Sequence, residues 1–318
     1  MANSDKHLVT DNAFLGPLKG GSAEPTYGGT LSFMRRRYTR DLAGVDAVVW
    51  GIPFDQATTN RPGARFGPQA IRRASAIFDG DPQYPFGVDP FETLAVIDYG
   101  DAAFDAGRPM DFARTIEAQA AAIIGTGAHL FSLGGDHFVT YALLKAHAAR
   151  HGALALVQFD AHQDTWPDEA DRISHGTFVK RAVAEGLIDP ARSIQIGIRT
   201  VAPEDCGIAI IGAEQVDDLG VAGVIERVRE RVGEAQAYLT FDIDCLDPAF
   251  APGTGTPVAG GLSSREALRI LRGLGDIDLV GGDVVEVAPP YDHADITAIA
   301  ASTVAMYYLG LLAERRKR

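Results

Sequence analysis

Short apolar segments alternate along this chain with amphipathic ones, and this alternation is the feature that most restricts its fold. Several of the apolar segments are too continuously apolar to be half-exposed strands, which is typical of strands covered on both faces of a parallel sheet. Strands that alternate with helices predict a three-layer α/β/α fold with a mostly parallel central sheet of about eight strands. The expected strands lie near residues 46–52, 93–98, 128–133, 153–159, 193–198, 208–211, 237–242 and 278–285.

Amphipathic periodicity predicts helices in the intervals. One begins at Gly67 and Pro68, with proline at a first-turn position, and runs through Ala74. Another is opened by a cap at Ser263 or Ser264 before Glu266. The other expected helices cover residues 110–125, 138–150, 175–186, 221–232 and 295–313, and the capped one covers 264–274.

The first 44 residues are different in character. They are rich in Gly, Pro, Asn and Arg and show little periodicity, so they are expected to form an N-terminal arm over the body of the domain, with a subunit contact as one role. Residues 45–318 contain no low-complexity linker and no internal repeat. A single domain over 45–318 is the simplest expectation.

The charge balance restricts the partners. With 29 basic and 42 acidic side chains the net charge is −13, which disfavours nucleic acid and favours a metal or cationic substrate, although acidity also simply promotes solubility. The two cysteines, Cys206 and Cys245, define no disulfide framework. We find no signal-peptide apolar region near the N-terminus and no uninterrupted apolar span of membrane length. A cytoplasmic protein without a membrane partner is therefore expected.

Three side chains with metal-binding chemistry follow the apolar run at residues 154–159. Asp160, His162 and Asp164 are spaced two residues apart. In an extended backbone such residues share a face. Two carboxylates and an imidazole on one face are suitable ligands for a hard divalent cation.

A second strand repeats this spacing. Asp242 and Asp244 follow an apolar run at residues 237–241 and share a face. Ile243 and Cys245 point the other way, which argues against Cys245 as a ligand.

Two more strand ends carry polar residues, at 133–137 and 284–286. Since ligands bind beyond the carboxyl ends of parallel strands, all four stretches are expected to converge. Each alone has an ordinary structural interpretation: a glycine turn, a helix cap or a salt bridge. Together they place several charges at the ends of apolar strands, where unpaired charge is costly and metal ions would offset the cost. The candidate ligands are His137, Asp160, His162, Asp164, Asp242 and Asp244.

Six ligands with shared carboxylates suit a two-metal site, with ions about 3.5–4 Å apart and a bridging water as nucleophile. Oxygen and imidazole ligands without thiolate favour Mn²⁺, with Ni²⁺, Co²⁺, Fe²⁺ and Zn²⁺ as alternatives. His175 lies beside Gly176 and is either a proton carrier in a loop or a residue at a helix start.

Five motifs resemble the ureohydrolase (arginase/agmatinase) family, and the similarity is closest to its bacterial agmatinase branch. The resemblance extends from about residue 25 to 312 in the family's order and spacing, and it implies an arginase-like catalytic domain. The motifs are GGDH at 134–137, DAHQD at 160–164, SHGT at 174–177, TFDIDCLDP at 240–248 and PGTGTPVAGG at 252–261.

The resemblance also implies which residues bind two Mn²⁺ ions. One ion would be held by His137, Asp160, Asp164 and Asp242. The other would be held by His162, Asp160, Asp242 and Asp244, so that Asp160 and Asp242 bridge the pair.

Three residues have catalytic roles by the same resemblance. A metal-bridging hydroxide would attack the guanidinium carbon of a small cationic substrate, and Asp164 would accept its hydrogen bond. Glu286 would bind the guanidinium, and His175 would move protons to the leaving amine.

The substrate is less closely defined. Arginases carry an Asn- and Ser-rich loop before the histidine motif, whereas residues 166–174 here are acidic and lack asparagine, which disfavours arginine. Asp168, Glu169 and Asp171 would suit the ammonium group of agmatine, giving urea and putrescine for polyamine synthesis, unless they are only a solvated loop. Arg172 would suit the carboxylate of an ω-guanidino acid instead, such as 4-guanidinobutanoate or 3-guanidinopropionate. Phe178 replaces the methionine of typical agmatinases and leaves the details of the substrate pocket open.

The family implies a homo-oligomer, a trimer or hexamer. A metal-binding regulator or scaffold is disfavoured by the combination of Asp164, His175 and Glu286, and His175→Ala would slow an enzyme but leave a scaffold unchanged. A nucleotide-binding protein is disfavoured because residues 253–255 lack the lysine of a P-loop.

Overall fold

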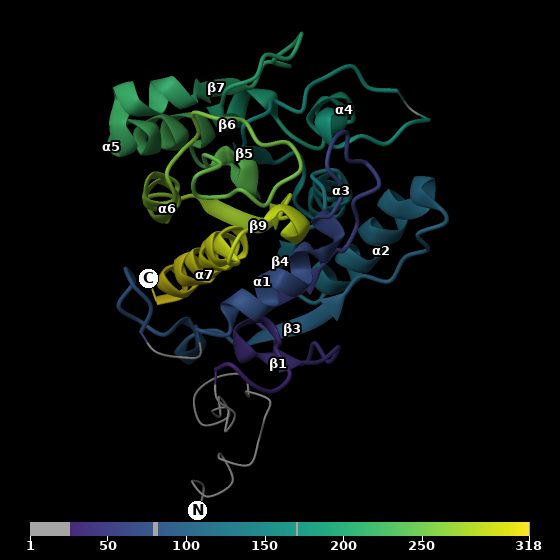
Figure 1. Cartoon of the computed structure of the whole chain (residues 1–318), viewed down its shortest axis with the longest axis vertical. Helices are drawn as coiled ribbons and strands as arrows, with labels where there is room; N and C mark the ends of the chain where they lie inside the picture. Colours follow the sequence, from purple (N-terminus) through teal and green to yellow (C-terminus); the bar gives the residue numbers. More distant parts are fainter. Residues whose placement is uncertain (1–25, 79–81, 170, 318) are drawn as a thin grey trace, which may run out of the picture.

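The computed structural model describes residues 26–78, 82–169 and 171–317, and in them one parallel sheet forms the centre of the molecule. The strand order is β1-β3-β2-β4-β9-β8-β5-β6-β7. Figure 1 shows β1 and β7 at opposite ends of the molecule. The strands are β1 (Arg37–Tyr38), β2 (Ala47–Gly51), β3 (Val96–Asp101), β4 (His129–Leu133), β5 (Ala155–Phe159), β6 (Ile194–Ile198), β7 (Ala209–Gly212), β8 (Gln236–Asp242) and β9 (Asp278–Val285). All eight predicted strands are present, and the predicted fold class is confirmed.

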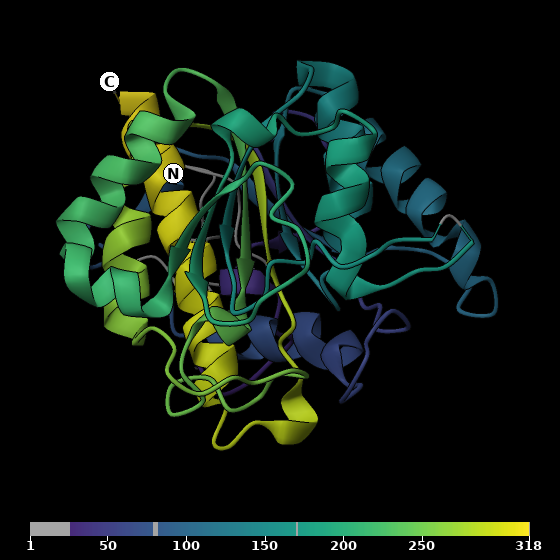
Figure 2. The same cartoon turned by 90° about the horizontal axis from the view of Figure 1, so that it is seen from above.

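Helices cover both faces of the sheet (Figure 2). The first hydrophobic cluster includes buried residues of α1, α5, α6 and α7, and the second includes those of α2, α3 and α4. Strand β8 contributes to both by alternation, with Leu239 in the first cluster and Tyr238 in the second. The helices are α1 (Gly67–Ser75), α2 (Phe112–Gly125), α3 (Val139–His151), α4 (Phe178–Ala184), α5 (Ala213–Val232), α6 (Ser264–Arg272) and α7 (Ile296–Lys317).

Strand β1 was not predicted. It pairs in parallel with β3, Arg37 opposite Ile97, and so adds an edge strand within the segment expected to be an arm. Just before it, Phe33 and Met34 are fully buried, and the Phe33 amide donates to Asp98 Oδ2 at 2.7 Å. Residues 1–25 of the predicted arm lie outside the described part of the chain.

One helix start differs from prediction, one helix agrees with it after a kink, and one cap agrees. Helix α5 contains Gly220, whose φ of 64° is not helical, and the part of α5 that follows this kink and ends at Val232 coincides with the predicted helix 221–232. The shorter part that begins at Ala213 was not predicted. Residues His175–Thr177 form a separate 3₁₀ turn before α4. At the start of α6 the Ser263 hydroxyl accepts from the Glu266 amide at 3.2 Å, forming the predicted capping box.

Helix α7 is long and apolar enough to cross a membrane by length and composition. Its most apolar window is nevertheless 72% buried inside the protein. It packs against α1 and α6 (Figure 1). These contacts identify α7 as a core helix.

Buried His147 on α3 predicts a pH-dependent stability. Burial, together with His151 and Arg150, outweighs the hydrogen bond with the Leu143 carbonyl and lowers the pKa of His147 to about 4. Since its unfolded pKa is about 6.5, the neutral imidazole contributes full stability above pH ~6.5, and about 3 kcal/mol is lost as the pH falls toward 4. We expect His147→Gln to unfold with a weaker pH dependence than wild type between pH 4.5 and 7, measured by urea denaturation. Equal dependence in both proteins would contradict this assignment.

Candidate metal centre

The predicted site residues converge because the strands that carry them are neighbours. Strands β4, β9, β8 and β5 lie side by side at the centre of the sheet. Their carboxyl ends lead to His137, Glu286, Asp242 and Asp160 in that order. Residues more than one hundred positions apart therefore meet at one edge, as predicted.

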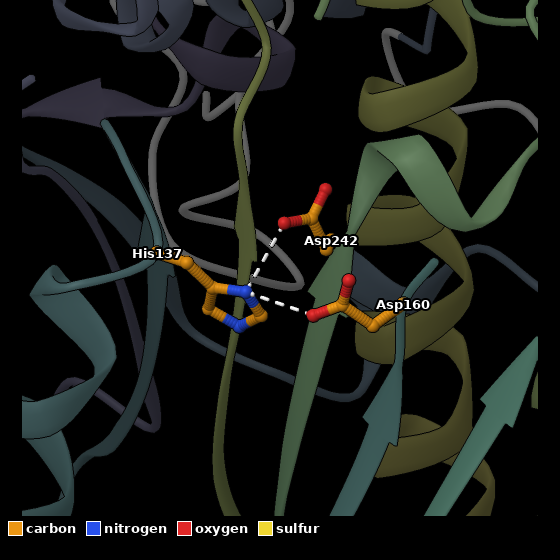
Figure 3. Close-up of side chains that lie close together, drawn as sticks. All are labelled: His137, Asp160 and Asp242. Carbon is orange, nitrogen blue, oxygen red and sulfur yellow. Dashed lines mark ion pairs between the residues drawn. The ribbon is translucent and has the colours of Figure 1, made fainter. Parts of the chain in front are cut away.

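His137 lies at the centre of a group of carboxylates. Its Nδ1 atom is 3.1 Å from a carboxylate oxygen of Asp160, of Asp164 and of Asp242. Figure 3 shows the imidazole directed at Asp160 and Asp242. All four side chains are buried.

A second group shares one of these carboxylates. His162 Nδ1 lies 3.1 Å from Asp244 Oδ2 and 3.4 Å from Asp160 Oδ1. In the described residues two sets have ligand atoms within 4.8 Å of one another: His137, Asp160 and Asp242, and Asp160, His162 and Asp244. Asp160 is common to both sets. The bridging role of Asp242 remains a prediction.

The proton on His137 is fixed by a relay behind it. Thr240 Oγ1 donates to Asp283 Oδ1 at 2.6 Å, so it must accept from His137 Nε2 at 2.8 Å. The carboxylate of Asp283 also accepts from Thr140 Oγ1 at 2.9 Å. With its proton on Nε2, His137 presents a lone pair on Nδ1, which has no hydrogen-bond partner in the described residues. A lone pair facing three carboxylates fits a cation between them.

The electrostatics of the cluster lead to the same conclusion. Burial disfavours a charged His137, but the facing carboxylates of Asp160, Asp164 and Asp242 outweigh it and raise its pKa well above its usual range. Burial, followed by Asp244 and Asp160, raises the pKa of Asp242 well above its usual range. Crowded buried carboxylates cannot all ionise unless cations offset their repulsion. The donor set therefore fits two divalent ions, and Cys245 lies in the hydrophobic core, as predicted.

Asp160 is oriented by a chain of amides. Gln158 Nε2 donates to Asp160 Oδ2 at 2.6 Å, and Gln195 Nε2 donates to Gln158 Oε1 at 2.8 Å. The His162 amide donates to Asp160 Oδ1 at 2.7 Å. These bonds position both carboxylate oxygens, one toward each histidine.

Unusual backbone conformations occur at two of the predicted site residues. Asp164 and Glu286 have φ of 51° and 63°, in the left-handed region that costs most residues about 1–3 kcal/mol. Nearby, Gly135 allows close approach, since a Cβ there would lie 1.7 Å from Phe54 O. Strain of this kind persists where the surrounding structure fixes a side chain in a required position.

Glu286 connects His175 to the candidate ligands, which we call the metal-ligand cluster: His137, Asp160, His162, Asp164, Asp242 and Asp244. Its Oε1 atom accepts from the His137 amide at 2.8 Å and from His175 Nδ1 at 2.7 Å. Its Oε2 atom is buried and has no hydrogen-bond partner in the part of the chain described. An unpaired buried carboxylate oxygen is costly, so Oε2 is suited to a cationic ligand.

A residue not predicted from sequence contacts the other side of the His175 ring. The amide and hydroxyl of Thr59 lie 3.1 Å and 2.7 Å from His175 Nε2. Burial lowers the pKa of His175, but Glu286 outweighs it and raises the pKa to about 9. The amide of Thr59 can only donate, however, so this geometry fits a neutral ring with its proton on Nδ1. A second proton on Nε2 requires the contact with Thr59 to open.

A pocket of about 500 Å³ opens at this cluster. Thr59, His162, Asp164, His175 and Asp242 line it. The acidic loop, residues 166–174, forms another wall of the pocket. The loop residues that line the pocket include Trp166, Pro167, Asp168, Glu169 and Arg172.

The acidic residues of this loop are less available to a substrate than the sequence suggested. Asp168 is not free, because Arg181 donates to both of its oxygens at 2.7 Å. Asp171 is exposed and absent from the described lining of the pocket. Glu169 and Arg172 both line it, so the loop presents one acid and one base, and its composition alone does not select a cationic substrate.

Phe178 lies against the metal-ligand cluster. Its ring centroid is 4.5 Å from that of His137, and the side chain is fully buried. It therefore supports the orientation of His137, and it is not part of the described pocket lining.

Sequence reasoning missed several residues that orient the site. Gln158, Thr240 and Asp283 are buried polar residues inside apolar strands, and that contrast with their neighbours was a signal that could have identified them. Thr59 and Arg181 gave no comparable signal, because their partners are distant along the chain.

Comparisons with known proteins agree with this geometry. The chain matches the family model described as Arginase family over residues 45–310. It is 52% identical over 316 residues to an agmatinase of Chromobacterium violaceum, covering 98% of each chain. A crystal structure of a hypothetical agmatinase from Burkholderia thailandensis has a TM-score of 0.92 at 56% identity, covering 94% of this chain and 96% of that one. The proclavaminate amidinohydrolase of Streptomyces clavuligerus has a TM-score of 0.85 at 40% identity, covering 92% and 100%.

Proposed function

This chain belongs to the arginase family, and we propose that it hydrolyses agmatine to urea and putrescine. The observation that carries the proposal is the buried carboxylate of Glu286, with one unpaired oxygen, next to two groups of metal-binding side chains. The agmatinase of Chromobacterium violaceum, at 52% identity over nearly the whole chain, supports agmatine as the substrate.

The metal ligands are proposed to be His137, Asp160, Asp164 and Asp242 for one ion, and His162, Asp160, Asp242 and Asp244 for the other. Two divalent ions held there would supply a nucleophilic water near neutral pH and neutralise the charge of the carboxylates. We propose Mn²⁺, with Ni²⁺ or Co²⁺ as less favoured alternatives, because the donors are carboxylate oxygens and imidazole nitrogens.

The protein's own groups then perform three tasks. Glu286 Oε2 accepts hydrogen bonds from the guanidinium and orients its carbon. Asp164 accepts a hydrogen bond from the attacking water. His175 carries a proton to the leaving amine: the bond from Nδ1 to Glu286 holds the ring in place, and the contact of Nε2 with Thr59 opens when Nε2 takes up the proton.

A second candidate substrate class is favoured by one observation. Arg172 lines the pocket, where it would attract the carboxylate of an ω-guanidino acid such as 4-guanidinobutanoate or 3-guanidinopropionate. The proclavaminate amidinohydrolase, at 40% identity, is named for a substrate that carries a carboxylate.

We further propose a cytoplasmic homo-oligomer, a trimer or hexamer. Both cysteines are free in the structure, which suits a reducing compartment. Light scattering after gel filtration would measure the mass of the assembly, and a monomer would contradict this part of the proposal.

The substrate is tested by urea release from Mn²⁺-loaded protein. Agmatine, 4-guanidinobutanoate, 3-guanidinopropionate and arginine are compared side by side at equal concentration. We expect the highest kcat/KM with agmatine. A higher value with either guanidino acid would replace agmatine by the second candidate, and no urea from any of them would contradict the proposed function.

A further inference from the structure

Arg181 on helix α4 is bonded to the acidic loop through one guanidinium. Its Nε donates to Asp168 Oδ2 and its Nη2 to Asp168 Oδ1, both at 2.7 Å. The same Nη2 donates to the carbonyls of Glu169 and Arg172 at 2.9 and 2.8 Å. One side chain therefore holds three residues that line the pocket.

The network continues to the turn that carries His175. Thr177 Oγ1 donates to Asp168 Oδ1 at 2.9 Å, and Thr177 belongs to the same 3₁₀ turn as His175. The Trp166 amide also donates to the Gly176 carbonyl at 3.2 Å. Hydrogen bonds thus join the acidic loop to the turn that carries His175, and Arg181 is hydrogen-bonded to the same loop.

This ion pair is not an ordinary surface pair. The Arg181 and Asp168 side chains are only 12% and 17% exposed. The guanidinium carbon also lies 5.4 Å from the Tyr141 ring and 5.9 Å from the Phe138 ring. A two-pronged, largely enclosed pair is stronger and more directional than an exposed one.

We propose that Arg181 is a positioning residue for substrate binding. It fixes the wall formed by Asp168, Glu169 and Arg172, and it neutralises the carboxylate of Asp168, so that Glu169 and Arg172 are the charges left to meet the far end of the guanidino substrate. This inference deepens the proposed function and rests on it.

Lysine cannot reproduce this role. Its ammonium group is a point charge without the planar fork of arginine, so it cannot hold both Asp168 oxygens and two carbonyls together. Arg181→Lys should therefore behave almost like Arg181→Met. The matched control is Lys180→Met on the same helix, whose ion pair with Glu204 is more exposed and whose side chain is not in the described pocket lining.

The test measures kcat and KM on the best wild-type substrate, the bound metal, and amide hydrogen exchange over residues 166–174. We expect Arg181→Met to raise KM about 10-fold, because displacement of binding groups is costly, with a smaller change in kcat and unchanged metal content. Exchange should increase in residues 166–174. The control should change none of these quantities.

Two results would overturn the inference. In the first, the KM of Arg181→Met stays within twofold of the wild-type value; Arg181 would then have only a structural role, even if the melting temperature of the variant falls. The second is unchanged hydrogen exchange in the loop. If the wild-type protein prefers a guanidino acid, only the agmatine proposal is contradicted, because the Arg181 variants are then assayed with that acid. The hydrogen-exchange measurement does not depend on activity with any substrate.

Discussion

Asp160→Asn is expected to cause the largest loss of activity of any single conservative change in this protein. Asp160 belongs to both groups of metal-binding side chains, with Oδ2 near His137 and Oδ1 near His162. The amide removes one charge and one oxygen from the donor set. A metal ion supplies several kcal/mol of transition-state stabilisation, and about 1.36 kcal/mol corresponds to tenfold in rate, so we expect urea release to fall about 1,000-fold.

The same protein should lose bound metal, measured as ions per chain after dialysis. Asp171→Asn is the matched control, because Asp171 is an exposed acid of the nearby loop and should leave both rate and metal content unchanged. Circular dichroism checks that the variant is folded. Full metal content together with wild-type activity in Asp160→Asn would refute the shared-ligand assignment.

Glu286→Gln is expected to separate substrate binding from metal binding. The amide oxygen can still accept from the His137 amide and from His175 Nδ1, as Oε1 does now. Its NH₂ group would replace the unpaired Oε2 and repel a guanidinium. Loss of one partner of a buried charge pair costs about 2–5 kcal/mol, so kcat/KM should fall about 30- to 5,000-fold.

Metal content should stay at the wild-type level in Glu286→Gln, in contrast to Asp160→Asn. Glu204→Gln is a suitable control, because the Glu204 side chain is 60% exposed. If Glu286→Gln loses metal in proportion to activity, Glu286 supports the metal-ligand cluster and does not bind the substrate.

The fold was predictable because it depends on local periodicity. Each predicted strand is a mainly apolar segment, and side chains of these strands contribute to the hydrophobic clusters on the two faces of the sheet. The exception, β1, is only two residues long and consists of Arg37 and Tyr38, so it has no apolar pattern to detect. It is defined by pairing with β3, which is a tertiary contact.

The metal-ligand cluster was predictable for a different reason. Parallel strands bring their carboxyl ends together, so charged residues that follow such strands must be near one another. The choice of partners among those charges was not predictable. Asp168 was interpreted as available to a substrate, yet Arg181, 13 residues away, occupies both of its oxygens. Which acid meets which base depends on how the loop folds against α4, and sequence spacing does not specify that.

Adding Mn²⁺ to metal-free protein, while bound metal and urea release from agmatine are both measured, would show whether these side chains hold two metal ions that agmatine hydrolysis requires. We expect two ions to bind per chain and activity to appear as they bind. Agmatine hydrolysis at full rate in the metal-free protein, or saturation at a single ion per chain, would contradict this expectation.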